Sequence, residues 1–174
     1  MKITLIVLAV LVAVVAIVAI IGAMLPRDHV ASVTATIPAP RDKVWQALTD
    51  VAAFPTWRSE VQKVDVLSTS PLTWRETAKT GSMTLAAETF EPPQRLVGRI
   101  QDQGMPFGGT WEYVLAPDPS DSARTRVTIT ERGWVSNPIF RFVSKYVMGH
   151  YSTLEAYTRA LGRKFGADVT PTRV

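Results

Sequence analysis

The chain has 174 residues, a length suited to one globular domain, and 47% of them are hydrophobic. It contains no cysteine, which excludes disulfides, thiolate chemistry and thiol-ligated zinc. Its two histidines, His29 and His150, are far apart in the sequence, which disfavours a histidine metal centre. The net charge of +4 is too small to indicate nucleic-acid binding. We therefore expect no metal, no cofactor and no nucleic-acid partner.

The N-terminal segment is apolar on every face, because residues 3–25 carry no charged side chain. As a helix this run would be about 34 Å long, enough for a hydrocarbon layer of roughly 30 Å. A cleaved signal peptide is the alternative, but its apolar core usually has about 7–15 residues, and only Ala23 offers a weak cleavage site. We expect residues 1–26 to form an uncleaved transmembrane anchor.

Charges beside this segment predict its orientation. Lys2 and the α-amino group precede it, whereas Arg27 on the other side is followed by Asp28. Positive charge favours the cytoplasmic side. The sequence thus predicts a single-pass protein with a cytoplasmic N-terminus and the rest of the chain on the extracytoplasmic side.

The remaining sequence reads as one α+β domain over residues 27–166. Residues 30–37 have the β-branched content of a strand, and residues 41–50 and 51–54 read as two short helices before Pro55. Alternating patterns separated by turn residues then predict further antiparallel strands. These are residues 61–68, 72–79, 83–90, 95–102, 111–115 and 125–134.

A long C-terminal helix is expected to follow Asn137-Pro138, a typical helix start. It carries one apolar stripe at intervals of three and four residues: Val143, Val147, His150, Leu154, Tyr157 and Leu161. Only the sheet can bury this stripe, so we expect the sheet to curve around the helix and to leave a cavity beside it. The helix should end before Gly166, with residues 167–174 as a flexible tail.

Several short sequence motifs resemble the helix-grip superfamily, also called SRPBCC, START or Bet v 1-like. They are Thr-Ile-Pro-Ala-Pro at 36–40, Val-Trp-Gln-Ala-Leu-Thr-Asp at 44–50, Phe-Pro-Thr-Trp at 54–57, Glu-Pro-Pro-Gln-Arg-Leu at 91–96, Thr-Trp-Glu-Tyr at 110–113 and Thr-Ile-Thr-Glu-Arg-Gly at 128–133. The resemblance implies a curved antiparallel sheet of about seven strands around a long C-terminal helix. The superfamily includes lipid carriers, other binding proteins and polyketide cyclases, so it indicates a fold more than a function.

The expected cavity would be lined mainly by apolar and aromatic side chains with a few polar groups. We predict that the ligand-binding residues are Trp74, Trp111, Tyr113, Ile129, Tyr146, Val147, His150, Leu154 and Tyr157. The other aromatic residues are expected to belong to the core.

Three residues are candidates for acid/base catalysis. His150 lies within the apolar stripe, and Glu76 and Glu131 share strand faces with apolar residues, where burial would raise a carboxyl pKa. The competing interpretation is structural. His150 would be a core histidine or a simple ligand contact, and the glutamates would reach solvent or pair with a nearby arginine: Arg75, Arg99 or Arg132. The structural interpretation is favoured.

Two surface features leave alternatives open. The loop at residues 104–109 reads equally as a lid, a membrane-touching tip or a plain loop. The last helix is basic, which indicates a solvated face or attraction to anionic lipid headgroups. Its charged residues are Arg141, Lys145, Arg159, Arg163 and Lys164, against Glu155.

The sequence therefore predicts a membrane-anchored binding or carrier protein for a hydrophobic small molecule, such as a lipid, an isoprenoid or quinone, or a polyketide-like compound. Membrane lipids are expected partners through the anchor. The first alternative is an enzyme of the polyketide cyclase/dehydratase type. The second is a protein-interaction or stress module with a vestigial pocket. Binding is favoured over catalysis.

Overall fold

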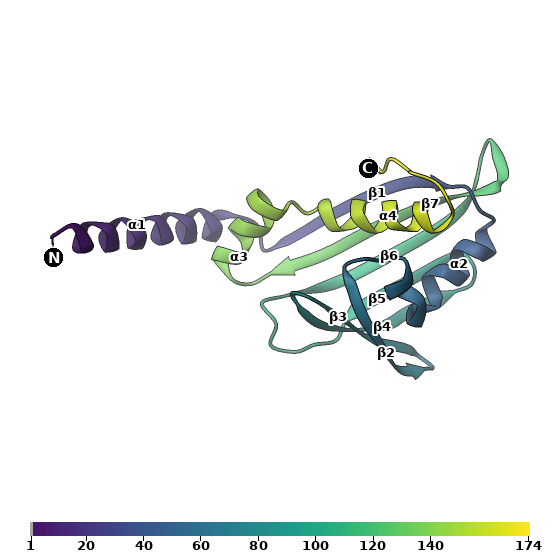
Figure 1. The fold of residues 1–174 in the computed structure, drawn as a ribbon, viewed down its shortest axis with the longest axis horizontal. Helices are drawn as coiled ribbons and strands as arrows, with labels where there is room; N and C mark the ends of the chain where they lie inside the picture. The colour runs from purple at the N-terminus through teal and green to yellow at the C-terminus, as the bar shows by residue number, and fades with distance from the viewer. Residues whose placement is uncertain (1) are drawn as a thin grey trace.

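A long apolar helix projects from one end of an α+β domain (Figure 1). The structure is a computed structural model that describes residues 2–174. The helical elements are α1 (Lys2–Met24), α2 (Arg41–Thr49), the 3-10 helix η1 (Val51–Thr56), α3 (Pro138–Val143), the π-helix η2 (Ser144–Met148) and α4 (Ser152–Lys164). The strands are β1 (Asp28–Ile37), β2 (Val61–Thr69), β3 (Leu72–Ala78), β4 (Gly81–Glu91), β5 (Arg95–Ile100), β6 (Phe107–Asp118), β7 (Asp121–Val135) and β8 (Thr172–Arg173).

The strands form one antiparallel sheet in the order β2-β3-β4-β5-β6-β7-β1-β8. It curves so that α4 lies against β1 and β7 (Figure 1), while α2 contacts β6 and β7 and η1 contacts β2. This arrangement confirms the predicted α+β helix-grip fold and adds the two-residue strand β8.

The core lies between α4 and the sheet because two periodicities meet there. Alternate residues of β1 point inward, with Val33 and Ile37 fully buried. On α4, Leu154 and Leu161 recur at helical spacing and are also fully buried. Burying such a side chain stabilises the fold by about 1.5–3 kcal/mol. These contacts fix the position of Tyr157, which lies between the two leucines on the same stripe.

The predicted continuous C-terminal helix is interrupted, which corrects one part of the sequence interpretation. Asn137 begins α3 as expected, because its side chain accepts hydrogen bonds from the backbone N–H groups of Ile139 and Phe140. The chain then passes through η2 and breaks at Gly149, whose φ of 73° is readily adopted only by glycine. As a result, Val147 is 72% exposed and does not join the buried stripe of α4.

The C-terminal residues, expected to be a flexible tail, are held against the edge of the sheet. Thr172 and Arg173 pair with Thr34 and Val33 of β1. The guanidinium of Arg173 donates to Glu155 at 2.8 Å and lies 4.5 Å from the ring centroid of Tyr151. These contacts join the tail to both β1 and α4.

Helix α1 is long and apolar enough to cross a membrane, and nearly all of its side chains are exposed. Gly22 is its buried residue. It lies so close to α3 that a Cβ at this position would collide with the carbonyl oxygen of Pro138. A glycine at this position lets the end of α1 pack directly on the start of α3.

Candidate functional site

Aromatic rings gather around Tyr157 on the inner face of α4. The Tyr157 ring lies 5.5 Å from the centroids of Trp57 and Tyr113 and 6.1 Å from that of Trp111. Trp57 follows η1, whereas the other two partners come from the inner face of β6. Tyr157 is 2% exposed, while Trp57 and Trp111 are only half-buried. The helix, the 3-10 turn and the sheet therefore meet in one aromatic cluster.

A buried ion pair adjoins this cluster. Arg58 is 8% exposed and donates to Oε1 of Glu76 at 3.0 Å and to Glu60 at 2.8 Å. The indole N–H of Trp74 donates to the same Glu76 oxygen at 2.9 Å. The Arg58 guanidinium also lies 4.6 Å from the centroid of the Tyr157 ring. A charged pair so placed has lost much of its hydration and depends on these partners.

The electrostatic environment keeps the arginine charged and the tyrosines neutral. Burial lowers the pKa of Arg58, but the nearby Tyr157 and Glu76 more than offset this effect and the net shift is upward. Burial raises the pKa of both Tyr113 and Tyr157. At neutral pH the cluster thus offers one cation and two phenol groups, which are donors as well as acceptors.

Two cavities lie outside this cluster. One, of about 250 Å³, is located where α1 joins the domain, and the other, of about 270 Å³, lies between the α2–η1 region and the end of α4. Aromatic side chains occupy the space beneath α4, so a ligand bound there would have to displace some of them. One group in this space has no partner among the described residues: the indole N–H of Trp57 is buried without a hydrogen-bond acceptor.

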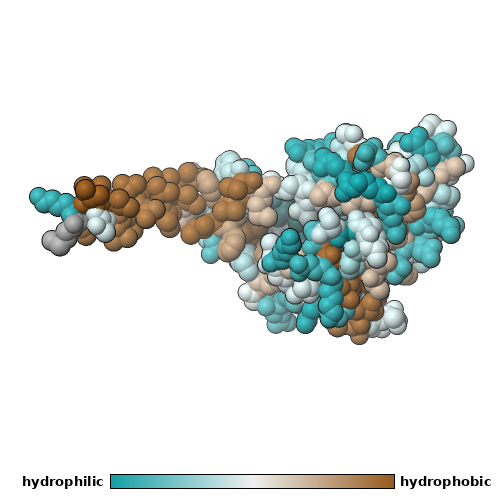
Figure 2. Space-filling view, in the orientation of Figure 1, coloured by the Kyte–Doolittle hydropathy of each residue, from teal (hydrophilic) through white to brown (hydrophobic). Residues whose placement is uncertain are grey.

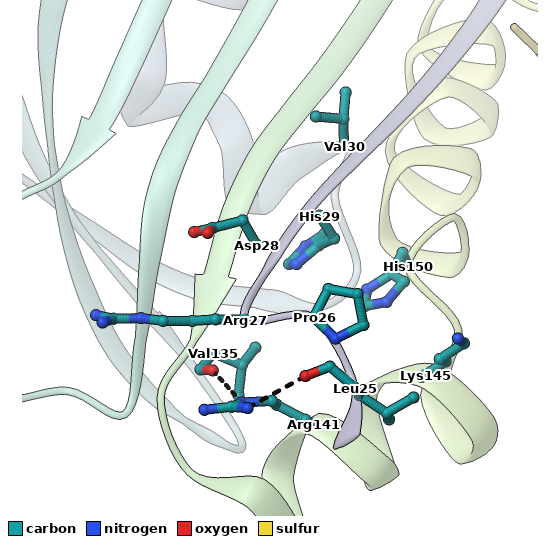
Figure 3. A pocket seen from close by; sticks show the side chains of 10 residues that line it. All are labelled: Leu25, Pro26, Arg27, Asp28, His29, Val30, Val135, Arg141, Lys145 and His150. Carbon is teal, nitrogen blue, oxygen red and sulfur yellow. Dashed lines mark hydrogen bonds between the residues drawn. The ribbon is translucent and has the colours of Figure 1, made fainter. Parts of the chain in front are cut away.

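A second group of polar residues lines the cavity at the α1 junction (Figure 3). The rings of His29 and His150 are stacked with centroids 4.0 Å apart, and Nε2 of His29 lies 3.6 Å from Oε1 of Glu131. Nδ1 of His150 lies 3.3 Å from the Ser144 hydroxyl. Burial, and then the neighbouring His29, lower the pKa of His150. This group joins β1, β7 and the segment between η2 and α4.

Arg141 of α3 holds the junction together through backbone carbonyls. Its guanidinium donates to Leu25 at 3.2 Å and to Val135 at 2.8 Å (Figure 3), and also to Ser136 at 2.8 Å. These bonds connect the end of the apolar helix to the end of β7 and the start of α3. The basic side chain therefore has a structural function in addition to its charge.

The structure separates the predicted ligand-binding residues into two places. The interior group surrounds Tyr157 and the Arg58–Glu76 pair, or belongs to the adjoining core: Trp74, Trp111, Tyr113, Ile129, Leu154 and Tyr157. His150 lies instead at the junction, and Tyr146 and Val147 of η2 are 58% and 72% exposed.

The acid/base candidates also divide. Glu76 is held in the interior by Arg58 and Trp74, whereas Glu131 and His150 both lie beside His29. None of the arginines considered from the sequence pairs with Glu76: Arg75 donates to Thr84 and Arg99 pairs with Glu88. Within residues 2–174, no group of three histidine, aspartate or glutamate side chains is arranged so that it could hold a metal ion.

Arg58 is the polar residue of the interior that sequence reasoning missed. Its only sequence signal is its position directly after the Phe-Pro-Thr-Trp motif at 54–57. Its partner Glu76 lies on another element, and only the packing of η1 beside β2 and β3 brings the two side chains together.

Solved structures of distant proteins share this architecture. A START superfamily protein from Mycobacterium smegmatis superposes with a TM-score of 0.64 at 19% identity, covering 79% of this chain and 97% of that one. The Zhui aromatase/cyclase from Streptomyces sp. R1128 superposes with a TM-score of 0.60 at 17% identity, covering 78% of this chain and 93% of that one. Norcoclaurine synthase from Thalictrum flavum superposes with a TM-score of 0.63 at 10% identity, covering 79% of this chain and 94% of that one. These similarities show that the chain has the START-like helix-grip fold.

The family follows from the sequence itself. Residues 28–163 match the family model described as polyketide cyclase / dehydrase and lipid transport, and the chain belongs to that family. No curated protein sequence gave a match. The family and the fold together support a domain that binds hydrophobic ligands.

Proposed function

We propose that this protein is a membrane-anchored binding or carrier protein whose ligand lies between α4 and the sheet. The ligand would be a hydrophobic or amphipathic small molecule, such as a lipid, an isoprenoid or quinone, or a polyketide-like compound. Membership of a family described by polyketide chemistry and lipid transport supports this chemical class. The proposed anchor, α1, would keep the domain close to the bilayer in which such molecules dissolve.

The observation that carries the proposal is the Arg58–Glu76 pair inside an aromatic cluster. A buried ion pair is weak support for stability, because the loss of hydration offsets much of its attraction. A binding function gives it a purpose, since a cation and a carboxylate can hold the polar end of a ligand while aromatic rings contact its apolar part. The unpaired Trp57 N–H offers an additional donor in the same place.

The half-buried rings indicate how the space could open. Trp57 and Trp111 flank Tyr157 and are less enclosed than Tyr157 itself. Rotation of these side chains would exchange ring–ring contacts for ring–ligand contacts. The closed cluster is then the ligand-free state, and binding should change tryptophan emission.

The first test uses 1-anilinonaphthalene-8-sulfonate, a fluorescent probe with an apolar ring system and one negative charge. The full chain in nanodiscs is titrated with the probe, and empty nanodiscs give the background. The double variant Arg58→Met/Glu76→Gln should weaken binding about tenfold, the size expected for losing one hydrogen bond to a charged group. Changing both partners avoids leaving a single buried charge, so the variant should remain folded.

The matched control is Arg75→Met, which removes an exposed arginine from the same region of β3. It should leave probe affinity unchanged. Equal affinity in the double variant and this control would refute the interior site. Native mass spectrometry of the full chain then identifies any co-purifying small molecule, and its disappearance from the double variant would support the proposal.

A further inference from the structure

Large apolar side chains of α3 and η2 are exposed in one short stretch of the chain. Their exposed fractions range from 41% to 72%: Ile139, Phe140, Tyr146, Val147 and Met148. Single exposed hydrophobic residues are common, but a contiguous group on a domain surface marks an interaction site.

This stretch adjoins the end of the apolar helix. Gly22 of α1 packs on Pro138, and Arg141 donates to the carbonyl of Leu25. Gly22 lies about 3 Å along the helix axis from Met24, the last residue of α1. Figure 2 shows the hydrophobic surface of α1 continuing onto the adjoining part of the domain, where Figure 1 places α3. The exposed side chains therefore begin at the level where α1 would leave a bilayer.

The charges within the stretch itself are of one sign. Residues 132–154 include no aspartate or glutamate, whereas Arg141 and Lys145 lie within α3 and η2. Lys145 Nζ lies 5.6 Å from the ring centroid of Tyr146, and nearby the Arg27 guanidinium lies 4.9 Å from that of Trp134. Basic side chains, aromatic rings and apolar groups on one short helical segment are typical of a membrane interface.

We propose that residues 138–148 lie in the interfacial layer of the bilayer, with their exposed apolar side chains among the acyl chains and Arg141 and Lys145 facing anionic headgroups. The inference rests on the proposed function in one respect, the anchoring of the chain by α1. Continuity with α1 favours lipid over a protein partner, because any surface packed on the last turn of a spanning helix already lies at lipid depth. Basic residues near an anionic surface add to the attraction.

The absence of cysteine allows a direct test with single labels. Val147→Cys in the full chain is labelled with an environment-sensitive nitrobenzoxadiazole dye and reconstituted into phosphatidylcholine/phosphatidylglycerol vesicles, with or without brominated acyl chains. We expect blue-shifted emission and strong quenching by the brominated lipid. Leu67→Cys is the matched control, because Leu67 is 53% exposed on β2, the opposite edge strand of the sheet. It should show neither effect.

A third label separates this inference from the anchor itself. Val14→Cys lies within α1 and reports whether that helix enters the bilayer. Quenching at Val14 without quenching at Val147 would overturn the inference and leave the anchor intact. Absence of quenching at both positions would overturn both. A blue shift at Val147 that brominated lipid does not quench would indicate a protein contact, from a partner or a second copy, and would also overturn it.

Discussion

His150 does not lie where its sequence pattern predicts, on the buried stripe of the C-terminal helix. It continues the apolar stripe by spacing, yet it lies at the α1 junction, stacked on His29. The groups that face it are His29, Glu131, Lys145 and Ser144. Because burial and His29 both oppose its positive charge, the folded protein favours the neutral ring.

The lowered pKa of His150 predicts a pH-dependent stability. Its unfolded pKa is about 6.5, so between the folded pKa and 6.5 the unfolded chain binds more protons. The free energy of unfolding should therefore be highest above this pH window and should decrease as the pH falls through it. We expect His150→Gln to reduce the slope of unfolding free energy against pH, measured by chemical denaturation of the full chain. Ser144→Ala removes a neighbour that does not titrate and should retain the slope. A slope in His150→Gln equal to that of the unchanged chain would contradict the prediction.

Sequence reasoning at the residue scale succeeded where strand alternation was clear. Leu72, Trp74 and Glu76 share one face of β3, and Trp74 and Glu76 indeed meet through a hydrogen bond in the interior. Arg58 could not be predicted in this way, because no periodicity places an arginine in a turn next to a glutamate on a distant strand. The folded arrangement of η1 and β3 determines that pair.

At the element scale, the break at Gly149 makes the predicted continuous C-terminal helix wrong. Spacings of three and four residues run from Val143 to Leu161 without interruption, and periodicity cannot reveal a change in backbone direction. The only sequence signal for a break is Gly149 itself. The break separates α3, which contacts α1, and the adjoining η2 from α4, which contacts β1 and β7. Composition likewise cannot predict that the C-terminal residues form a strand, because this two-residue strand exists only by pairing with the edge of β1.

The contact between α1 and α3 predicts that Gly22→Ala destabilises the protein. Alanine favours a helix over glycine by about 1 kcal/mol, but its Cβ would collide with the backbone of Pro138. Overpacking of this kind costs about 1–3 kcal/mol and should exceed the gain. Denaturation in detergent, followed by tryptophan emission, measures the difference. The neighbouring Ala23 is exposed, so Ala23→Leu should have little effect. Stability of Gly22→Ala at or above that of the unchanged chain would show that the two helices do not pack as described.

At the scale of the whole molecule, the sequence predicted the order of elements and most of the interior, because both follow from local patterns. It did not predict that the candidate residues form two groups, one around Tyr157 and one beside α1. The two groups are separate because the last helical region breaks at Gly149 and because the end of β7 pairs with the first residues of β1. The proposed ligand site and the proposed bilayer contact are therefore separate parts of one domain.

The proposed orientation gives a prediction for the complete chain. Alkaline phosphatase fused after Val174 should be active, because the positive-inside bias places the domain outside the cytoplasm. Reversing the flanking charges with Lys2→Glu and Asp28→Lys should lower that activity. A silent fusion on the unchanged chain, with a cytoplasmic reporter active at the same position, would refute the orientation.

The two margins of the sheet have a consequence for self-association. At one margin, β8 pairs with β1 and Val174 donates its backbone N–H to Ser32, so the chain's own end occupies hydrogen-bonding groups there. At the other, β2 has irregular register at two points along its pairing with β3 and carries the charged residues Lys63 and Asp65. Interrupted or charged strands are poor templates for a foreign strand. Crowding many copies on a membrane surface should therefore not join them into a continuous intermolecular sheet.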